Sequence, residues 1–314
     1  PNLITVDELK GSLRKAIAGD KRFGDLAISL LIDKISSNSS SAKIDSLDVL
    51  MDSASVYDPS SFIQYRYQLE VVIFSEIVAN PDTKIQLKAL KLINLLSKSL
   101  IEAVDEAKNW MNKFLIEAVK AIELESPEIL PKSAVLIESV ASSCEKSFTY
   151  ALDTCAIPLI KYSFAKNIRG QVARNSLVAL FSPLKCNPQW IQNVKEEVIS
   201  NLNIFFSSND CGFESYGVYL VIFSFISACL DVNVAINFIQ KFTCLTGDSS
   251  ISNELKNCIW LASKSYPSGF SDLIGHLNND EIISASASTE DLTKIVLIRL
   301  LQLNKISSME QVIK

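Results

Sequence analysis

The chain has little glycine, proline or histidine for its length. Its 314 residues include nine Gly, nine Pro and a single His, His276. So few glycines and prolines allow few tight turns, which disfavours an all-β architecture. One histidine cannot supply the ligand spacing of a zinc site, and no cysteine lies near it in sequence. The composition therefore points away from β-sandwiches and from histidine-based metal sites.

The common motifs of catalytic and cofactor chemistry are also missing. No CxxC, GxGxxG, P-loop, GxSxG or HExxH pattern occurs in the sequence. The adjacent carboxylates Asp105-Glu106 and Glu196-Glu197 would point to different faces of a helix, so we expect solvated charges there rather than an acid–base pair. We predict no catalytic residue, no metal site and no cofactor, and hence a protein that is not an enzyme.

Neither an excess of positive charge nor a membrane-length apolar run is present. Lys and Arg number 30 against 35 Asp and Glu, which gives a net charge of −5. Nucleic-acid binding needs clustered positive charge, so we expect no direct nucleic-acid partner. The longest apolar stretch, Gly217–Leu230, has 14 residues and is interrupted by serines. A membrane-spanning helix needs about 20 apolar residues, so we predict no membrane partner.

The seven cysteines are odd in number and scattered along the chain. No two are closer than eleven residues, and most lie within apolar runs. Such usage is typical of cytosolic proteins, in which thiols serve as small core hydrophobes. The opening residues 3–6 give way at once to Asp7 and Glu8, so we also expect no signal peptide. A thiol-based enzyme is an open alternative, but it would need one reactive cysteine of low pKa.

Small residues recur through the chain at a nearly constant spacing. The separations are 43, 44, 43, 41 and 41 positions, and an apolar residue follows four places after each. A period near forty residues in helical sequence predicts stacked helix pairs, an all-α solenoid with an α-α superhelix of the HEAT type. We expect each small residue midway along the first helix of its pair, where a neighbouring helix approaches closely. The small residues are Ser46, Ala89, Ser133, Ser176, Gly217 and Cys258.

Capping signals locate the helices of these pairs. Thr5-Val6-Asp7-Glu8 has the form of a capping box and predicts a helix from there to about Ala18. Asp58-Pro59 and Ser126-Pro127 each combine a cap with a proline at the first helical position. We expect one solenoid over residues 1–314 with about six to seven pairs. Further helices are expected at 25–35, 41–57, 59–79, 84–100, 103–124, 127–144, 146–164, 169–184, 189–206, 213–230, 232–245 and 291–303. A sixth pair is expected to begin at 250, with a shorter second helix around 268–277.

Four lysines of the predicted helix 84–100 fall on related faces of that helix. They are Lys84, Lys88, Lys91 and Lys98. Lysines at such spacing usually form a solvated face. They are nevertheless the best candidates in the chain for a positive contact patch, and we name them as candidate partner-binding residues.

One long segment resembles a known family. Leu13–Leu50 contains the pair Arg22-Phe23, then LLIDKI, a serine-rich loop and SAKIDSLDVL. It is similar to the eukaryotic HEAT-repeat family named for methyl methanesulfonate sensitivity in DNA repair and transcription, the targeting scaffold of cytosolic iron–sulfur assembly. The similarity continues through Val71–Leu100, with NPDTKIQLKALKLINLLSKSL, and more weakly through Leu115–Ile160. Beyond about residue 185 only the repeats are recognisable.

The resemblance carries its own expectations. Members of the family are several times longer, so the chain would be an internal section of such a protein. It would be a non-enzymatic scaffold without a cofactor of its own, in the cytoplasm and nucleus. Its partners would be iron–sulfur assembly subunits and apo-proteins such as DNA helicases, polymerases and primase. A different HEAT or armadillo scaffold, such as a nuclear transport receptor or a phosphatase scaffold, is the alternative.

Overall fold

The computed structural model describes residues 5–192, 194, 196, 198–200 and 222, and every regular element within them is helical. The all-α prediction is confirmed. The chain divides into two compact units, residues 1–180 and 181–314. Gly217, Cys258, His276 and the helices predicted beyond residue 206 lie outside the described residues. The expectation of one solenoid through residue 314 therefore stays a prediction.

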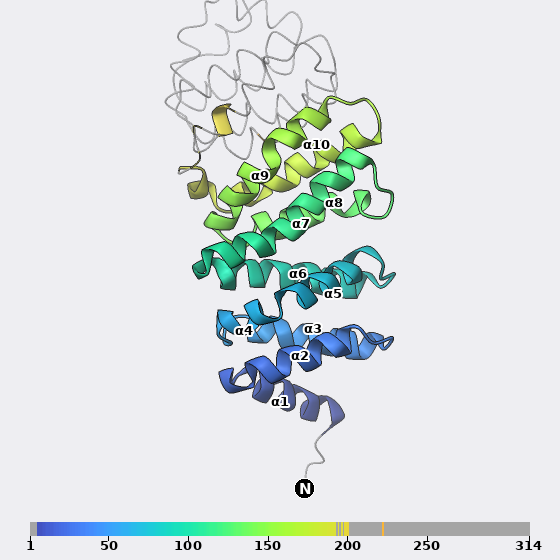
Figure 1. Cartoon of the computed structure of the whole chain (residues 1–314), viewed down its shortest axis with the longest axis vertical. Coiled ribbons are helices and arrows are strands. Elements are labelled where there is room, and N and C mark those ends of the chain that lie inside the picture. The colour runs from blue at the N-terminus through green and yellow to red at the C-terminus, as the bar shows by residue number, and fades with distance from the viewer. Residues whose placement is uncertain (1–4, 193, 195, 197, 201–221, 223–314) are drawn as a thin grey trace, which may run out of the picture. The chain divides into compact units, whose positions relative to one another are not determined.

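The helices of the first unit stack in chain order (Figure 1). α1, α3, α6 and α8 pack on one another in succession and form layer A. α2, the α4–α5 pair, α7 and α9 do the same and form layer B, and each layer packs on the other. This is the two-layer arrangement of a helix-pair solenoid. The helices are α1 Val6–Ala18, α2 Gly24–Ile35, α3 Ser40–Ser53, α4 Pro59–Gln64, α5 Arg66–Val78, α6 Thr83–Ser99, α7 Val104–Leu124, α8 Ser133–Ala141, α9 Glu145–Ser163 and α10 Ile168–Phe181.

Helix starts follow the capping residues read from the sequence. The Thr5 hydroxyl accepts a hydrogen bond from the Glu8 amide at 3.2 Å, and the Glu8 carboxylate accepts one from the Thr5 amide at 2.8 Å. This reciprocal pair is the predicted capping box. Asp58 caps α4 ahead of Pro59, as expected, and Asp82 caps α6 by accepting from the Lys84 amide at 2.8 Å. Local side chains therefore determine where these helices begin.

Two helices near residues 41–79 are shorter than predicted. The first, α3, ends at Ser53, and the second is broken at Tyr65 into α4 and α5. Within α4, Phe62 is buried and stacks on Tyr57 with ring centroids 6.0 Å apart. The break lets α4 bury this aromatic pair against α2, while α5 turns its own apolar face to α6. Tertiary packing overrides helix continuity here.

The predicted helix start at Pro127 is wrong. α8 begins at Ser133, after a turn and a 3-10 helix, Leu130–Lys132. Pro131 has no amide hydrogen to donate to the carbonyl of Pro127, so an α-helix running through both prolines would lose that bond. Ser133 is consequently the first residue of α8 rather than a mid-helix residue. The later start shortens the first helix of the third pair.

The recurring small residues are buried wherever the structure describes them. Ser46 is 4% exposed, and Ala89, Ser133 and Ser176 are fully buried. Three of them lie inside α3, α6 and α10, as predicted. The apolar residues four places later are all fully buried as well, namely Leu50, Ile93, Ile137 and Leu180. The forty-residue pattern therefore corresponds to close helix–helix contacts of the repeats.

The turn after α7 contains the single non-glycine residue with positive φ among the described residues. Glu125 has φ 52° and ψ 41°, in the left-handed region. Its carboxylate accepts a hydrogen bond from the Asn167 side chain at 2.8 Å and lies 3.8 Å from the Arg169 guanidinium. A strained turn is thus tied to the turn between α9 and α10, one repeat further along.

Candidate protein-interaction surface

All charged residues of α6 are lysines, and one face of the helix is apolar. Its sequence, TKIQLKALKLINLLSKS, holds four lysines and no acidic residue. The face toward the other helices is fully buried and consists of Ile85, Ala89, Leu92, Ile93 and Leu96. This spacing of apolar residues is that of an amphipathic helix. The positive charge of α6 must therefore be balanced by neighbouring helices, solvent or a partner.

The structure separates Lys88 from the other three lysines. The Lys88 ammonium pairs with the Asp48 carboxylate of α3, and the two side chains are only 22% and 15% exposed. The Asp48 carboxylate also lies 3.0 Å from a terminal guanidinium nitrogen of Arg14 in α1. Lys88 thus joins two repeats, and we assign it a structural role.

Ion pairs of this kind extend along layer A toward α1. The Arg14 Nε donates to Asp52 at 2.5 Å, and Lys10 lies 3.6 Å from Asp45. The pKa of Arg14 is raised, chiefly by its hydrogen bond to Asp52. All three aspartates of this face of α3 therefore have cationic partners on α1 or α6.

Lys84, Lys91 and Lys98 remain exposed on the outward side of α6. We call these three the α6 lysine row. None of their side chains forms an ion pair with another residue in the described part of the chain. Leu87, between the first two, is 67% exposed. The α6 lysine row is consequently a positive surface with an apolar residue in it.

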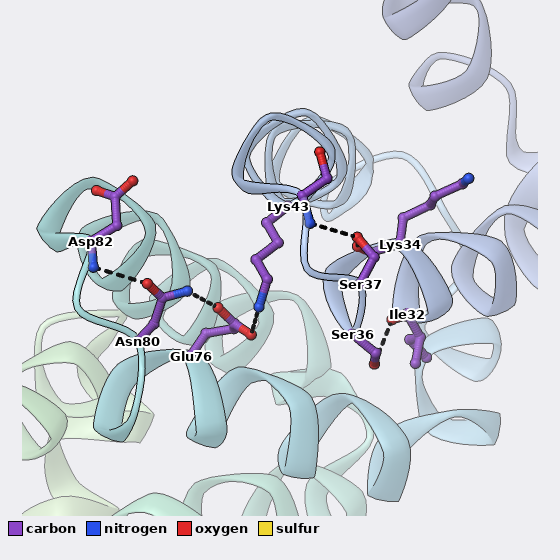
Figure 2. Close-up of polar contacts among 9 residues, drawn as sticks. Ile32, Lys34, Ser36, Ser37, Lys43, Glu76, Asn80 and Asp82 are labelled. Carbon is purple, nitrogen blue, oxygen red and sulfur yellow. Dashed lines mark hydrogen bonds and ion pairs between the residues drawn. The ribbon is translucent and has the colours of Figure 1, made fainter.

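A second polar network joins α3 of layer A to the end of α5 and the cap of α6 (Figure 2). The Lys43 ammonium of α3 pairs with the carboxylate of Glu76 at the end of α5, and Glu76 is 5% exposed. The Asn80 amide donates to the same carboxylate at 2.5 Å, and the Asn80 side-chain oxygen accepts from the Asp82 amide at 2.9 Å. Figure 2 shows these residues in a line from α3 to the cap of α6.

The same network continues into the next repeat. The Gln86 amide donates to the Asn80 carbonyl at 2.5 Å, and the Lys132 ammonium donates to the Gln86 side chain at 2.8 Å. Buried polar groups are costly unless they are paired in this way. The network therefore couples three successive repeats in their observed orientation.

Layer B also exposes large apolar side chains, which recur from one helix to the next. Each of its four long helices exposes at least one of them, at 37% to 72% of full exposure. Exposed apolar residues on successive packed helices are a feature of protein-binding surfaces. These residues are Leu26, Leu30, Tyr67, Val71, Val104, Ile116, Leu124 and Ile157.

One buried carboxylate lies beneath this apolar surface. The Glu70 carboxylate lies 3.2 Å from the Arg66 guanidinium, and both side chains are largely buried. Burial raises the pKa of Glu70, while the charges of Arg66 and Lys113 act in the opposite direction. The Arg66 guanidinium also lies over the Tyr67 ring, 4.3 Å from its centroid. These contacts hold α5 and its exposed Tyr67 in place.

Thiol chemistry has little support in the described residues. Cys144, Cys155 and Cys186 are free thiols. Burial raises the pKa of Cys155 to about 12, so it is a core thiol rather than a nucleophile.

Within the described residues no three His, Cys, Asp or Glu side chains gather as a metal site would require. None of the helices described is long and apolar enough to span a membrane. The predicted absence of a cofactor stays a prediction.

From the sequence, we named the four lysines but not the carboxylates of α3, one of which pairs with Lys88. The signal was present: Asp45, Asp48 and Asp52 follow one face of α3, and Lys88 comes forty residues after Asp48, about one repeat later. Glu76 carried no such signal because its partner Lys43 lies 33 residues away on another layer.

The comparisons with known proteins agree with the resemblance of Leu13–Leu100. Residues 1–79 match the N-terminal MMS19 family model, described as Dos2-interacting transcription regulator of RNA-Pol-II. The "MMS19 nucleotide excision repair protein homolog" of Xenopus laevis is 22% identical over 86% of this chain and 28% of its own length. The Homo sapiens protein of the same name is 25% identical over 63% of this chain and 20% of its own. The chain thus spans less than a third of the relatives it matches.

Two solved structures with similar backbones are an engineered and a designed protein. An engineered protein matches with a TM-score of 0.42 and 15% identity, covering 95% of this chain and 74% of its own. A designed armadillo repeat protein in complex with peptide (KR)4 matches with a TM-score of 0.38 and 13% identity, covering 74% and 98%. Both TM-scores are below 0.5, too low to define a shared architecture.

Proposed function

We propose that the chain, which is similar to MMS19 nucleotide excision repair proteins, is a section of a non-enzymatic scaffold for iron–sulfur cluster delivery. Its partners are then iron–sulfur assembly subunits and apo-proteins of DNA metabolism such as DNA helicases. It keeps no cofactor of its own, binds neither nucleic acid nor membrane directly, and works in the cytoplasm and nucleus.

The observation that carries the proposal is the division of labour between buried and exposed residues in the first unit. Its helices bury their small and apolar residues between repeats, and ion pairs such as Lys88–Asp48 lock neighbouring repeats together. The outward faces expose lysines on α6 and large apolar side chains on both layers. A stacked frame that leaves cationic and apolar side chains on its outer faces suits a protein that holds others.

The alternative scaffold classes call for a different surface. A receptor for basic localisation peptides needs an acidic groove. The exposed charges of α6 are lysines, and the acidic face of α3 is already paired with Lys10, Arg14 and Lys88. On layer A these charges favour an acidic client over a basic peptide; an acidic groove lined by the second helices, in layer B, would favour the receptor.

The test is co-purification of the tagged full-length protein from cells, combined with radioactive iron incorporation into a client helicase. We expect assembly subunits and iron–sulfur apo-proteins in the purified complex, and reduced iron incorporation when the protein is depleted. Recovery of neither class of protein, with unchanged iron incorporation, would contradict the proposal.

A further inference from the structure

We propose that the outward face of α6 is a docking surface for an acidic amphipathic helix of a partner protein. The inference rests on the proposed scaffold function and adds the chemistry of one partner. It concerns the α6 lysine row, Lys84, Lys91 and Lys98, together with Leu87.

The spacing of the α6 lysine row matches a helix better than an extended peptide. Lys84, Lys91 and Lys98 are seven residues apart, so they recur every two turns, at intervals of about 10.5 Å along the helix. Leu87 follows Lys84 by three residues, on the same side of α6. A partner helix with carboxylates every seventh residue and a leucine between them repeats this pattern in opposite charge.

No ion pair joins the row to another described residue, although Asp82 caps α6 beside Lys84 and Glu138 is exposed on the adjoining helix α8. α6 itself contains no acidic residue. The aspartates of the adjoining helix α3 are already paired with Lys10, Arg14 and Lys88. On the α8 side, Lys132 adds another positive group and donates to Gln86. An acidic partner would therefore meet three unpaired ammonium groups.

Other occupants fit the surface less well. Single-stranded nucleic acid is bound on aromatic platforms, and no exposed residue of α6 is aromatic. A membrane-binding helix needs a broad apolar face, whereas Leu87 is the one large hydrophobic residue strongly exposed on α6. One apolar anchor between heptad-spaced cations suits a helix with matching carboxylates.

The direct test is binding of a fluorescent synthetic helix to the full-length protein, followed by fluorescence anisotropy. The probe has about 21 residues, with Glu at every seventh position and Leu three residues after each Glu. We compare wild type with a variant carrying Lys84→Glu, Lys91→Glu and Lys98→Glu. Because three attractions become repulsions, we expect the affinity to fall about tenfold or more, and wild-type binding to weaken as salt rises.

Two further variants make the test specific. Lys108→Glu, Lys120→Glu and Lys161→Glu change the same charge on α7 and α9 of layer B, and should alter the affinity by less than about twofold. Leu87→Ala removes an exposed anchor without touching the core, and should weaken binding about threefold to tenfold. Circular dichroism melts confirm that each variant is folded.

Equal affinity of the probe for wild type and the α6 triple variant overturns the inference. The inference is also overturned if the probe does not bind the wild-type protein. It is likewise overturned if an oligonucleotide or phosphatidylserine vesicles bind the wild type but not the triple variant, while the probe binds neither. The proposed function fails separately: if iron–sulfur proteins never co-purify with the full-length protein while the probe binds through α6, the docking surface stands and its assignment to cluster delivery does not.

Discussion

The Asp48 carboxylate of α3 bridges Arg14 of α1 and Lys88 of α6. It lies 3.0 Å from the Arg14 guanidinium and pairs directly with the Lys88 ammonium, forty residues further along the chain. Only 15% of the Asp48 side chain is exposed. One carboxylate therefore links three successive helices of layer A, and its loss leaves two cations facing each other.

We expect Asp48→Ala to lower the free energy of unfolding by about 2–3 kcal/mol, because it leaves Arg14 and Lys88 uncompensated in a partly buried site. Asp45→Ala is the matched control, since Asp45 is on the same helix but its contact with Lys10 is exposed. That change should cost less than about 1 kcal/mol. Urea denaturation measures both, and equal losses would show that the bridge adds nothing.

Glu76→Ala should be more damaging. It removes the acceptor of Lys43 and of the Asn80 amide at a site where Glu76 is 5% exposed. Breaking such a buried pair costs about 3–5 kcal/mol. The control Glu117→Ala breaks a half-exposed contact with Lys113 at 3.9 Å and should cost less than about 0.5 kcal/mol. Similar melting temperatures of the two variants would contradict a role for the network.

Ala89→Leu tests the close contact at the recurring small residue. Ala89 is fully buried within α6, so three added heavy atoms must displace neighbouring helices. Overpacking of this kind lowers stability by about 1–3 kcal/mol. Lys91→Leu places the same side chain on the exposed side of α6 and should change stability by about 0.5 kcal/mol or less. An unchanged thermal melt for Ala89→Leu would refute the close approach.

Thiol labelling should distinguish Cys186 from Cys155. Cys186 is exposed, whereas Cys155 is fully buried with a pKa raised to about 12. At about pH 8 we expect an alkylating reagent to modify Cys186 in the native protein and Cys155 only after unfolding. Peptide mass spectrometry locates the modified residues. Rapid native modification of Cys155 would reopen the thiol-enzyme alternative.

Glu70 should make stability depend on pH in a defined direction. Burial raises the pKa of Glu70 above its ordinary value of 4.5, so the folded state holds the proton more tightly than the unfolded state. The unfolding free energy then falls as pH rises from 4.5 through the folded-state pKa. Glu70→Gln should remove this component. Urea titrations of wild type and variant across that range measure it, and parallel pH profiles would contradict the expectation.

Much of the helical framework could be read from local sequence. The box at Thr5 and Glu8 and the cap at Asp58 act within one turn, so they correctly located the starts of α1 and α4. The break at Tyr65 depends on Phe62 packing against Tyr57 and α2, which no local pattern reveals. The predicted start of α8 at Pro127 is wrong for a local reason. Ser126-Pro127 has the form of a cap, but Pro131, four residues later, cannot donate to the Pro127 carbonyl.

The candidate surface was only half predictable. Helical spacing alone places Lys84, Lys88, Lys91 and Lys98 on related faces of one helix. Whether each lysine is free depends on the side chains of the neighbouring repeat, and Asp48 removes Lys88 from the set. Residue contacts separated by about one repeat length are set by the stacking register rather than by local preference.

The left-handed turn at Glu125 gives one position two opposing effects. A non-glycine residue with φ 52° costs about 1 kcal/mol of backbone energy, which glycine would avoid. Glycine would also remove the carboxylate that accepts from Asn167 and lies near Arg169, exposed contacts worth about 1 kcal/mol or less. Because the two terms nearly cancel, exchange between Glu and Gly at this turn would be close to neutral for stability. The residue at this turn therefore decides whether side-chain contacts join the turn after α7 to the turn after α9, at little cost to stability.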